Sequence, residues 1–123
     1  MKLMAESEKF QILYEYEKVF LKIKSDSRLI LIGDFYGDPE SAVISEDEKC
    51  CAIVGEGLIV YFLHEPFDEY NSDSNKASQW CTWGRENEIV WINKIEKCDS
   101  QEIIIQLEDM RLVSIKIDEL LNK

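Results

Sequence analysis

The sequence contains few of the residues that break or bend a chain, and it contains a single histidine. Two prolines and five glycines are spread over 123 residues, and the one histidine is His64. Because zinc hydrolases and base-flipping deaminases need clustered histidine and cysteine ligands, a single histidine without an H-E-x-x-H or C-x-x-C motif argues against both classes. We expect His64 to be a structural or an exposed residue.

Long apolar runs are also absent. The N-terminal segment MKLMAESEKF has no signal-peptide core, and no run approaches the roughly 18 apolar residues of a membrane span. We therefore expect a soluble, cytoplasmic protein without membrane contact. The four cysteines, Cys50, Cys51, Cys81 and Cys98, are expected to be reduced and partly buried. Catalysis by Cys50 or Cys51 is disfavoured, because the neighbouring acidic residues oppose thiolate formation.

Motifs that bind phosphate or metal are missing as well. No glycine-rich phosphate loop occurs. Asp34, Asp38 and Glu40 in GDFYGDPE could converge on a divalent cation, but their spacing departs from a calcium loop. Gly37 and Pro39 explain the segment equally well as a tight acidic turn. We predict no cofactor, no metal and no enzymatic activity.

Acidic residues, by contrast, are in excess: 25 acidic and 14 basic side chains give a net charge of −11. Between Asp34 and Asp73 there are eleven acidic residues and a single basic one, Lys49, whereas the other 83 residues hold 14 acidic and 13 basic ones. Such a concentration of like charge opposes compaction and is typical of a surface that attracts a positive partner. The alternative is a solvated face that only maintains solubility.

Aromatic residues of this stretch lie among the acidic ones: Phe35, Tyr36, Tyr61, Phe67 and Tyr70. A nucleic-acid-binding surface would instead need basic residues between its rings. Aromatic anchors surrounded by carboxylates fit a basic protein, so we predict a protein partner and no nucleic acid.

Length and composition predict one domain over residues 1–123, because the chain is of typical domain size and 46% hydrophobic. We predict an α+β, β-dominated fold of about six to eight mostly antiparallel strands, with a C-terminal three-stranded meander and minor helix. Trp80 and Trp83 are expected to pack in the core.

Two hairpins and a buried strand are predicted before the meander. The hairpins pair 19–24 with 28–32 and 41–45 with 50–54, and the apolar run 58–63 is a strand buried on both faces. The polar segment 64–79 is a long loop suited to a contact surface. The meander comprises 89–95, 103–107 and 112–117, and 118–121 forms one helical turn.

Residues 9–23 allow two interpretations. Alternation of Ile12, Tyr14 and Tyr16 favours strands, whereas Ile12, Tyr16, Val19 and Ile23 are also spaced as on one face of a helix. Aromatic and β-branched residues favour the strands.

The run LIGDFYGDPESAVI, followed by CAIVGEGLIVYFLHEPF, resembles the small immunity proteins encoded beside bacterial polymorphic toxins, including contact-dependent growth inhibition systems. The resemblance covers roughly residues 27–67 and rests on short Gly/Asp-rich turns between strands. It implies an antitoxin that binds a cognate toxin domain, often a basic nuclease, and blocks its active site or substrate surface. No catalytic residues carry over, because such proteins act by binding.

We therefore predict a non-enzymatic inhibitor of a basic toxin. Its predicted contacts are acidic residues with two aromatic anchors: Asp34, Asp38, Glu40, Glu46, Asp47, Glu48, Glu65, Phe67, Asp68, Glu69 and Tyr70. One alternative is a small-molecule or enzymatic site beneath the 64–79 loop, with His64 or a cysteine inside. Another is an adaptor or subunit that binds through exposed strand edges.

Overall fold

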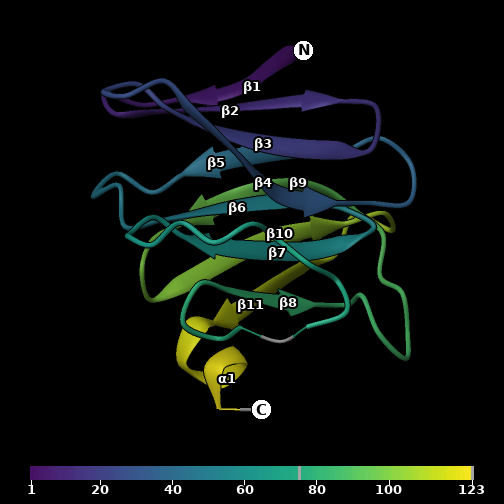
Figure 1. Cartoon of the computed structure of the whole chain (residues 1–123). Helices are drawn as coiled ribbons and strands as arrows, with labels where there is room; N and C mark the ends of the chain where they lie inside the picture. The colour runs from purple at the N-terminus through teal and green to yellow at the C-terminus, as the bar shows by residue number, and fades with distance from the viewer. Residues whose placement is uncertain (75, 123) are drawn as a thin grey trace.

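The computed structural model describes residues 1–74 and 76–122, which form a β-dominated fold with one short helix (Figure 1). In chain order its elements are β1 (Lys2–Glu6), β2 (Phe10–Glu15), β3 (Lys18–Ile23), β4 (Arg28–Asp34), β5 (Ser41–Ile44), β6 (Cys50–Gly55), β7 (Gly57–Phe62), β8 (Trp80–Trp83), β9 (Ile92–Cys98), β10 (Glu102–Leu107), β11 (Leu112–Lys116) and α1 (Ile117–Leu121). None of the described residues belongs to a helix with the length and apolar character needed to cross a membrane.

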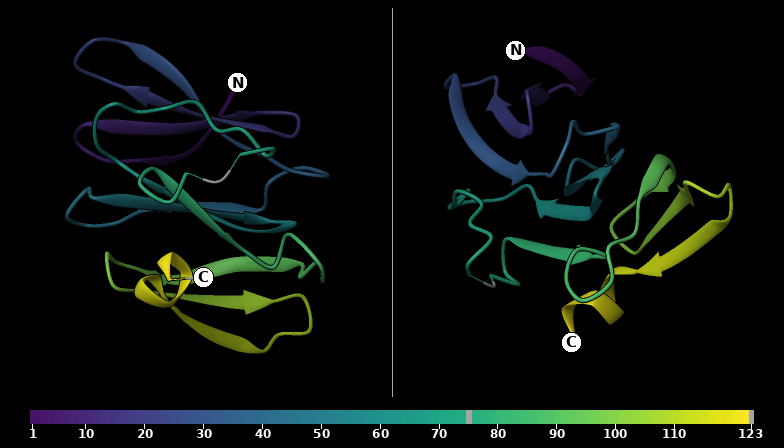
Figure 2. Two further views of the ribbon diagram at one scale, coloured as in Figure 1. Left: turned by 60° about the horizontal axis from the view of Figure 1, so that its bottom comes forward. Right: turned by 90° about the vertical axis from the view of Figure 1, so that its right-hand side faces the viewer.

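The strands form three antiparallel sheets. The first sheet has the order β1-β2-β3-β4, the middle sheet β5-β6-β7-β8 and the third sheet β11-β10-β9. The middle sheet shares one hydrophobic core with the first sheet and a second core with the third sheet and α1. Its strands therefore lie between the other two sheets (Figures 1 and 2).

Strands β6 and β7 are buried on both faces. Side chains such as Ile53 and Tyr61 point into the core with the first sheet, and neighbours such as Val54 and Leu58 point into the core with the third sheet. A strand covered on both faces needs a nearly continuous apolar sequence, because its alternate side chains enter different cores. The prediction of a doubly buried strand over 58–63 is confirmed.

Several other predicted elements are confirmed. The two hairpins are β3/β4 and β5/β6, the C-terminal meander is β9-β10-β11, and the helical turn is α1. Trp80 is buried as expected, and Trp83 is half-buried against the second core.

The predicted number of strands is wrong, because the described residues form eleven strands instead of six to eight. Two of those without a counterpart in the sequence prediction, β1 and β8, are edge strands of four or five residues. Edge strands bury less of their surface, so their apolar periodicity is weak. In β1 no side chain is fully buried.

The helical interpretation of residues 9–23 is also wrong. These residues form the β2/β3 hairpin, with Phe10 opposite Ile23 and Glu15 opposite Lys18. A helix would have placed Tyr16 on the same apolar face as Ile12 and Val19. In the structure Ile12 and Val19 are buried, whereas Tyr16 lies in the turn and is 80% exposed.

The long loop after β7 contacts both the first sheet and the middle sheet. The Tyr70 N–H donates to the Leu31 carbonyl oxygen of β4 (2.8 Å), and the Tyr61 hydroxyl donates to the Asp68 carbonyl oxygen (2.7 Å). Residues 64–74 and 76–79 of this predicted loop contain no strand or helix, and Asn75 lies outside the described residues. The loop therefore covers the core near β4.

Candidate partner-binding surface

Antiparallel pairing brings five turns and loops to one end of the molecule, which we call the acidic end. It comprises residues 15–18, 34–41, 55–57, 84–91 and 108–111. The turns lie on the right-hand side of Figure 1, and the right-hand panel of Figure 2 looks onto them. Residues from all three sheets therefore contribute to a single surface.

Charge is concentrated at the acidic end. Its residues include ten carboxylates and three cations, Lys18, Arg85 and Arg111, which gives a local charge of −7. Two of these cations already have acidic neighbours. Arg111 is 2.7 Å from Asp109, and Arg85 is 3.7 Å from Glu56. The surface is therefore strongly negative.

Large apolar side chains are exposed at the same end. Tyr16 is 80% exposed, Tyr36 73% and Trp91 43%, and Ile89 and Met110 of the same end are also exposed. Single exposed apolar residues are common, but three exposed rings at one end are typical of a protein contact surface. Tyr and Trp bring large contact area with few rotatable bonds.

Hydrogen bonds from neighbouring turns fix the backbone around Tyr36. The Glu56 carboxylate accepts the Tyr36 N–H (3.1 Å), and the Glu17 carboxylate accepts the Gly37 N–H (2.5 Å). Gly37 has φ = +87°, which a glycine adopts at little cost. This segment is therefore ordered before any partner binds, which reduces the entropy lost on binding.

Arg85 joins the first and middle sheets beneath the acidic end. Its guanidinium donates to the carbonyl oxygens of Glu56 and Asp34, each at 2.6 Å, and lies 4.6 Å from the centre of the Phe35 ring. Its charge is thus used inside the structure, and the outer carboxylates remain available to a partner.

The predicted contacts divide between the two ends of the molecule. Asp34, Asp38 and Glu40 lie at the acidic end and are exposed. Glu46, Asp47 and Glu48 lie in the β5/β6 turn at the opposite end. The sequence alone left open whether these acidic turns share one face, and the structure places the two groups at opposite ends.

Carboxylates at the opposite end are held by local hydrogen bonds. Asp47 accepts the Ser45 hydroxyl at 2.7 Å, and Glu48 accepts the Lys9 N–H at 2.9 Å and the Ser7 hydroxyl. The Ser45 bond lowers the pKa of Asp47, and the Ser7 bond lowers that of Glu48. Asp47 thus accepts hydrogen bonds within its own turn, and Glu48 connects the β1/β2 turn to the middle sheet.

Basic residues also accompany the opposite end. Glu65 pairs with Arg28 at 2.7 Å, and Lys24 donates to the Ser7 carbonyl oxygen at 2.8 Å. This end is therefore less negative than the acidic end.

The remaining predicted contacts lie in the loop after β7. Asp68 pairs with Lys76 at 3.1 Å, and the Glu69 carboxylate accepts the Leu31 N–H at 2.6 Å. Phe67 is half-buried, 6.2 Å from the Phe10 ring. Tyr70 is buried with its ring 5.4 Å from Trp80, so it is a core residue in this structure.

His64, Cys51 and Cys81 lie in surroundings that do not activate them as nucleophile or base. His64 is exposed, and its Nδ1 lies 2.9 Å from the carbonyl oxygen of Glu65. Burial raises the pKa of Cys51 and raises that of Cys81 to about 12, so both stay protonated at neutral pH. Among the described residues, no group of three potential ligands is placed to hold a metal ion.

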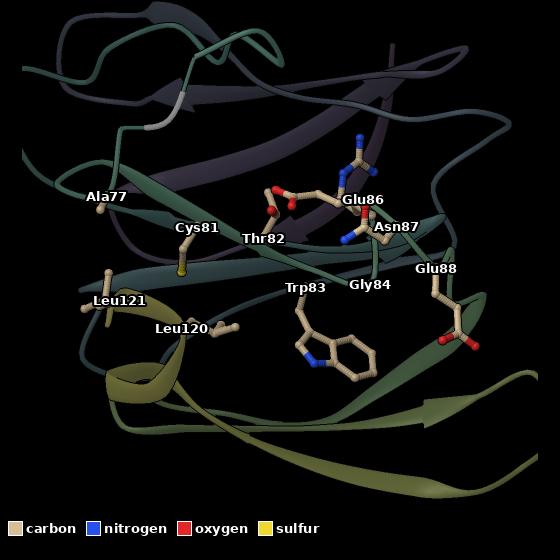
Figure 3. A pocket seen from close by; sticks show the side chains of 11 residues that line it. Ala77, Cys81, Thr82, Trp83, Gly84, Glu86, Asn87, Glu88, Leu120 and Leu121 are labelled. Carbon is tan, nitrogen blue, oxygen red and sulfur yellow. The ribbon is translucent and has the colours of Figure 1, made fainter. Parts of the chain in front are cut away.

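A groove of about 380 Å³ borders the acidic end between β8 and α1 (Figure 3). Cys81 and Trp83 line one part of it, Leu120 of α1 faces them, and Glu86 and Glu88 lie along its rim. Ala77 of the long loop also lines it. The site expected beneath this loop therefore corresponds to a groove that holds a protonated cysteine, and His64 is not among its lining residues.

Comparisons with known proteins provide no relative for this chain. No family model, curated protein or solved structure matches it.

Sequence reasoning missed the exposed rings of the acidic end. Tyr16 and Trp91 were not among the predicted contacts, and Tyr36 was noted only as an aromatic residue among acids. A turn signal at Tyr16-Glu17 between two alternating segments could have indicated the exposure of Tyr16. Trp91 lies next to the buried Ile92 in sequence, and no sequence signal distinguishes the exposed residue from the buried one.

Proposed function

We propose that this protein is a non-enzymatic inhibitor that binds a basic protein through the acidic end, as an immunity protein binds its cognate toxin. The observation that carries the proposal is the coincidence of a local charge of −7 with three exposed aromatic rings on an ordered set of turns. The toxin as partner, and a nuclease as its class, rest on the resemblance of residues 27–67.

Each part of the acidic end has a distinct role in this proposal. Carboxylates steer a basic partner toward the surface and discriminate against acidic proteins. Close charge pairs at such interfaces contribute about 1.5–7 kcal/mol by double-mutant cycles. Tyr16, Tyr36 and Trp91 supply the apolar contact area that holds the complex once formed.

The proposed contacts differ from the set that the sequence predicted. Asp34, Asp38 and Glu40 remain proposed contacts and are joined by the three exposed rings. Apart from Glu46, the predicted contact acids of the opposite end and of the long loop are engaged in local bonds, so we assign them a structural role first.

The direct test is calorimetry of the purified protein with the product of the adjacent upstream reading frame, at low and at high salt. We expect tight binding that weakens with salt, because exposed charge pairs are screened. Asp38→Lys and Tyr36→Ala should each weaken binding by about tenfold or more. Neither side chain is in a core, so thermal stability should hardly change.

The matched control is Glu46→Lys, which reverses an exposed charge in the turn at the opposite end. It should leave affinity nearly unchanged. If Glu46→Lys weakens binding and Asp38→Lys does not, the interface lies at the opposite end. If no binding occurs at any salt concentration, the inhibitor proposal fails.

A further inference from the structure

The outer face of the first sheet carries a row of apolar side chains that crosses all four strands. Leu3 lies opposite Leu13, Leu13 opposite Phe20, and Phe20 opposite Leu31. Their sequence neighbours point inward instead, and among the described residues none of these four packs into either core. Leu3 is 53% exposed, and the adjacent Leu29 is 45% exposed.

This pattern is unusual for a sheet with one face in water. Such a sheet normally alternates apolar inner residues with polar outer ones. The outer face of the third sheet follows that rule, because Ile104 is flanked by Lys97 and Ser114. The first sheet instead has the continuous apolar sequences of a sheet covered on both faces, as β6 and β7 are.

We propose that a second copy of this chain covers this face, so that two copies form a two-fold dimer through the outer faces of their first sheets. The charged residues around the apolar row favour a second copy of the chain as the partner. The rows beside the apolar one mix signs, with Glu15 opposite Lys18 on one side, and Glu6 and Lys22 on either side of Gln11 on the other. An equally acidic molecule meets less repulsion here than at the acidic end, which would select a basic partner.

A two-fold axis parallel to the strands, between β2 and β3, makes the face self-complementary. It places Leu13 against Phe20 of the second copy and Leu3 against Leu31 of the second copy, each contact occurring twice. The same operation sets Glu15 opposite Lys18 of the second copy. Stacked sheets of this kind lie about 10 Å apart with strands within about 30° of one another. Both acidic ends then lie on the same side of the dimer.

The dimer is independent of the proposed inhibitor function, and salt distinguishes the two. Each copy carries −11, so added salt should reduce repulsion and tighten the dimer, whereas it should weaken binding of a basic partner.

The test is sedimentation of the whole protein over a concentration series that reaches the millimolar range, at low and high salt. We expect a monomer–dimer equilibrium that Phe20→Glu weakens by about tenfold or more. Ile104→Glu is the matched control, because Ile104 is also half-buried on the outer face of a central strand. It should leave the dimer intact.

If Phe20→Glu fails to fold by circular dichroism, Leu3→Glu on the exposed edge strand gives the same test. A wild-type protein that is monomeric throughout overturns the proposal. So does a dimer that Ile104→Glu weakens as much as the first-sheet variants do, or one that those variants leave unchanged. If the wild type is monomeric and Phe20→Glu abolishes toxin binding, the face belongs to the basic partner instead.

Discussion

At the scale of single residues, Gly57 fixes the turn between the two most buried strands. Its φ is +75°, a region that other residues adopt only with strain. A Cβ atom there would lie 2.1 Å from Arg85 Cγ and 2.8 Å from the Gly84 carbonyl oxygen. Space as well as conformation therefore requires glycine.

Gly57→Ala should lower the free energy of unfolding by about 3 kcal/mol, because backbone strain and overlap add. Gly37 is the control, since its φ is +87° but no atom lies within 4 Å of the position that an alanine Cβ would occupy. Gly37→Ala should cost only the conformational strain of about 1–2 kcal/mol. Urea denaturation measures both values. Equal losses of unfolding free energy in the two variants would mean that Arg85 and residues 84–91 move aside without an energetic cost.

The residue scale is also where sequence prediction of the site was weakest. A pattern of apolar spacing identifies Ile12 and Val19 as core, but it does not say which aromatic residue a loop will bury. Tyr70 was predicted as an exposed anchor and lies in the core, because its N–H pairs with β4. Tyr16 was predicted as part of a strand or helix and is exposed at a turn.

At the scale of elements, the buried side chain of Gln79 makes three of the hydrogen bonds that hold the long loop. Its Nε2 donates to the carbonyl oxygens of Phe62 (2.7 Å) and His64 (3.0 Å), and its Oε1 accepts the Asp68 N–H (3.1 Å). Two backbone groups of the irregular segment and one at the end of β7 are bonded to one amide. Such a loop needs this kind of internal partner because it lacks a strand ladder.

Gln79→Leu should destabilise the fold by about 3 kcal/mol, since it keeps similar bulk but removes three hydrogen bonds and leaves the Asp68 N–H without its acceptor. Hydrogen exchange should accelerate at the Asp68 amide and in the loop more than in β6. Gln11→Leu, a half-buried glutamine on β2, is the control with little expected change. Uniform acceleration across all strands would contradict a local role for Gln79.

The third sheet carries a charged cluster on its outer face. Glu102 accepts hydrogen bonds from Lys116 (2.8 Å), Ser114 and Lys97 (3.1 Å). The bond from Lys116 is the largest cause, and together these bonds lower the pKa of Glu102 to about 2. The carboxylate is therefore better stabilised in the folded state than in the unfolded chain.

Because the folded pKa is depressed, the stabilisation from Glu102 is fully present above the unfolded value of about 4.5. It should be lost as the pH falls toward 2. Glu102→Gln should thus flatten the fall of stability over this range. Urea midpoints at a series of pH values measure the slope. Glu8→Gln removes the same charge at a position away from the cluster. If it flattens the pH dependence of stability as much as Glu102→Gln does, the effect does not come from the Glu102 cluster.

Element prediction succeeded for strands with an alternating or a continuous apolar pattern and failed for two of the edge strands. The doubly apolar run 58–63 and the alternating meander were predictable because burial imposes periodicity. β1 was missed because none of its side chains is fully buried, and β8 because its buried residues, Trp80 and Cys81, are adjacent and do not alternate. The distribution of acids between two ends followed from strand order, which sequence spacing alone does not specify.

At the scale of the whole molecule, two cores share the β6/β7 hairpin. Ile53 and Ile59 belong to one core, and Val54 and Leu58 belong to the other. Loss of either outer sheet would expose one full face of this hairpin. We therefore expect the two cores to unfold together, as parts of one domain.

We expect one cooperative transition in urea, with tryptophan fluorescence and far-ultraviolet circular dichroism giving the same midpoint. Native-state hydrogen exchange should give similar opening free energies at Ile53 of the middle sheet and Ile105 of the third sheet. Lys2 and Leu3 on the edge strand should exchange faster. A third sheet that opens at lower denaturant than the rest would indicate two separate folding units.

The β6/β7 hairpin, which is covered on both faces in the folded protein, also affects the behaviour of the unfolded chain. Residues 50–63 combine β-branched and aromatic side chains with one charge, Glu56 at the turn. Segments of this composition form intermolecular cross-β contacts when exposed. During synthesis β6 and β7 emerge before β9–β11, which cover their second face, so a nascent chain displays this hairpin half-covered. The strong negative charge at both of its flanks then keeps neighbouring chains apart until the third sheet is complete.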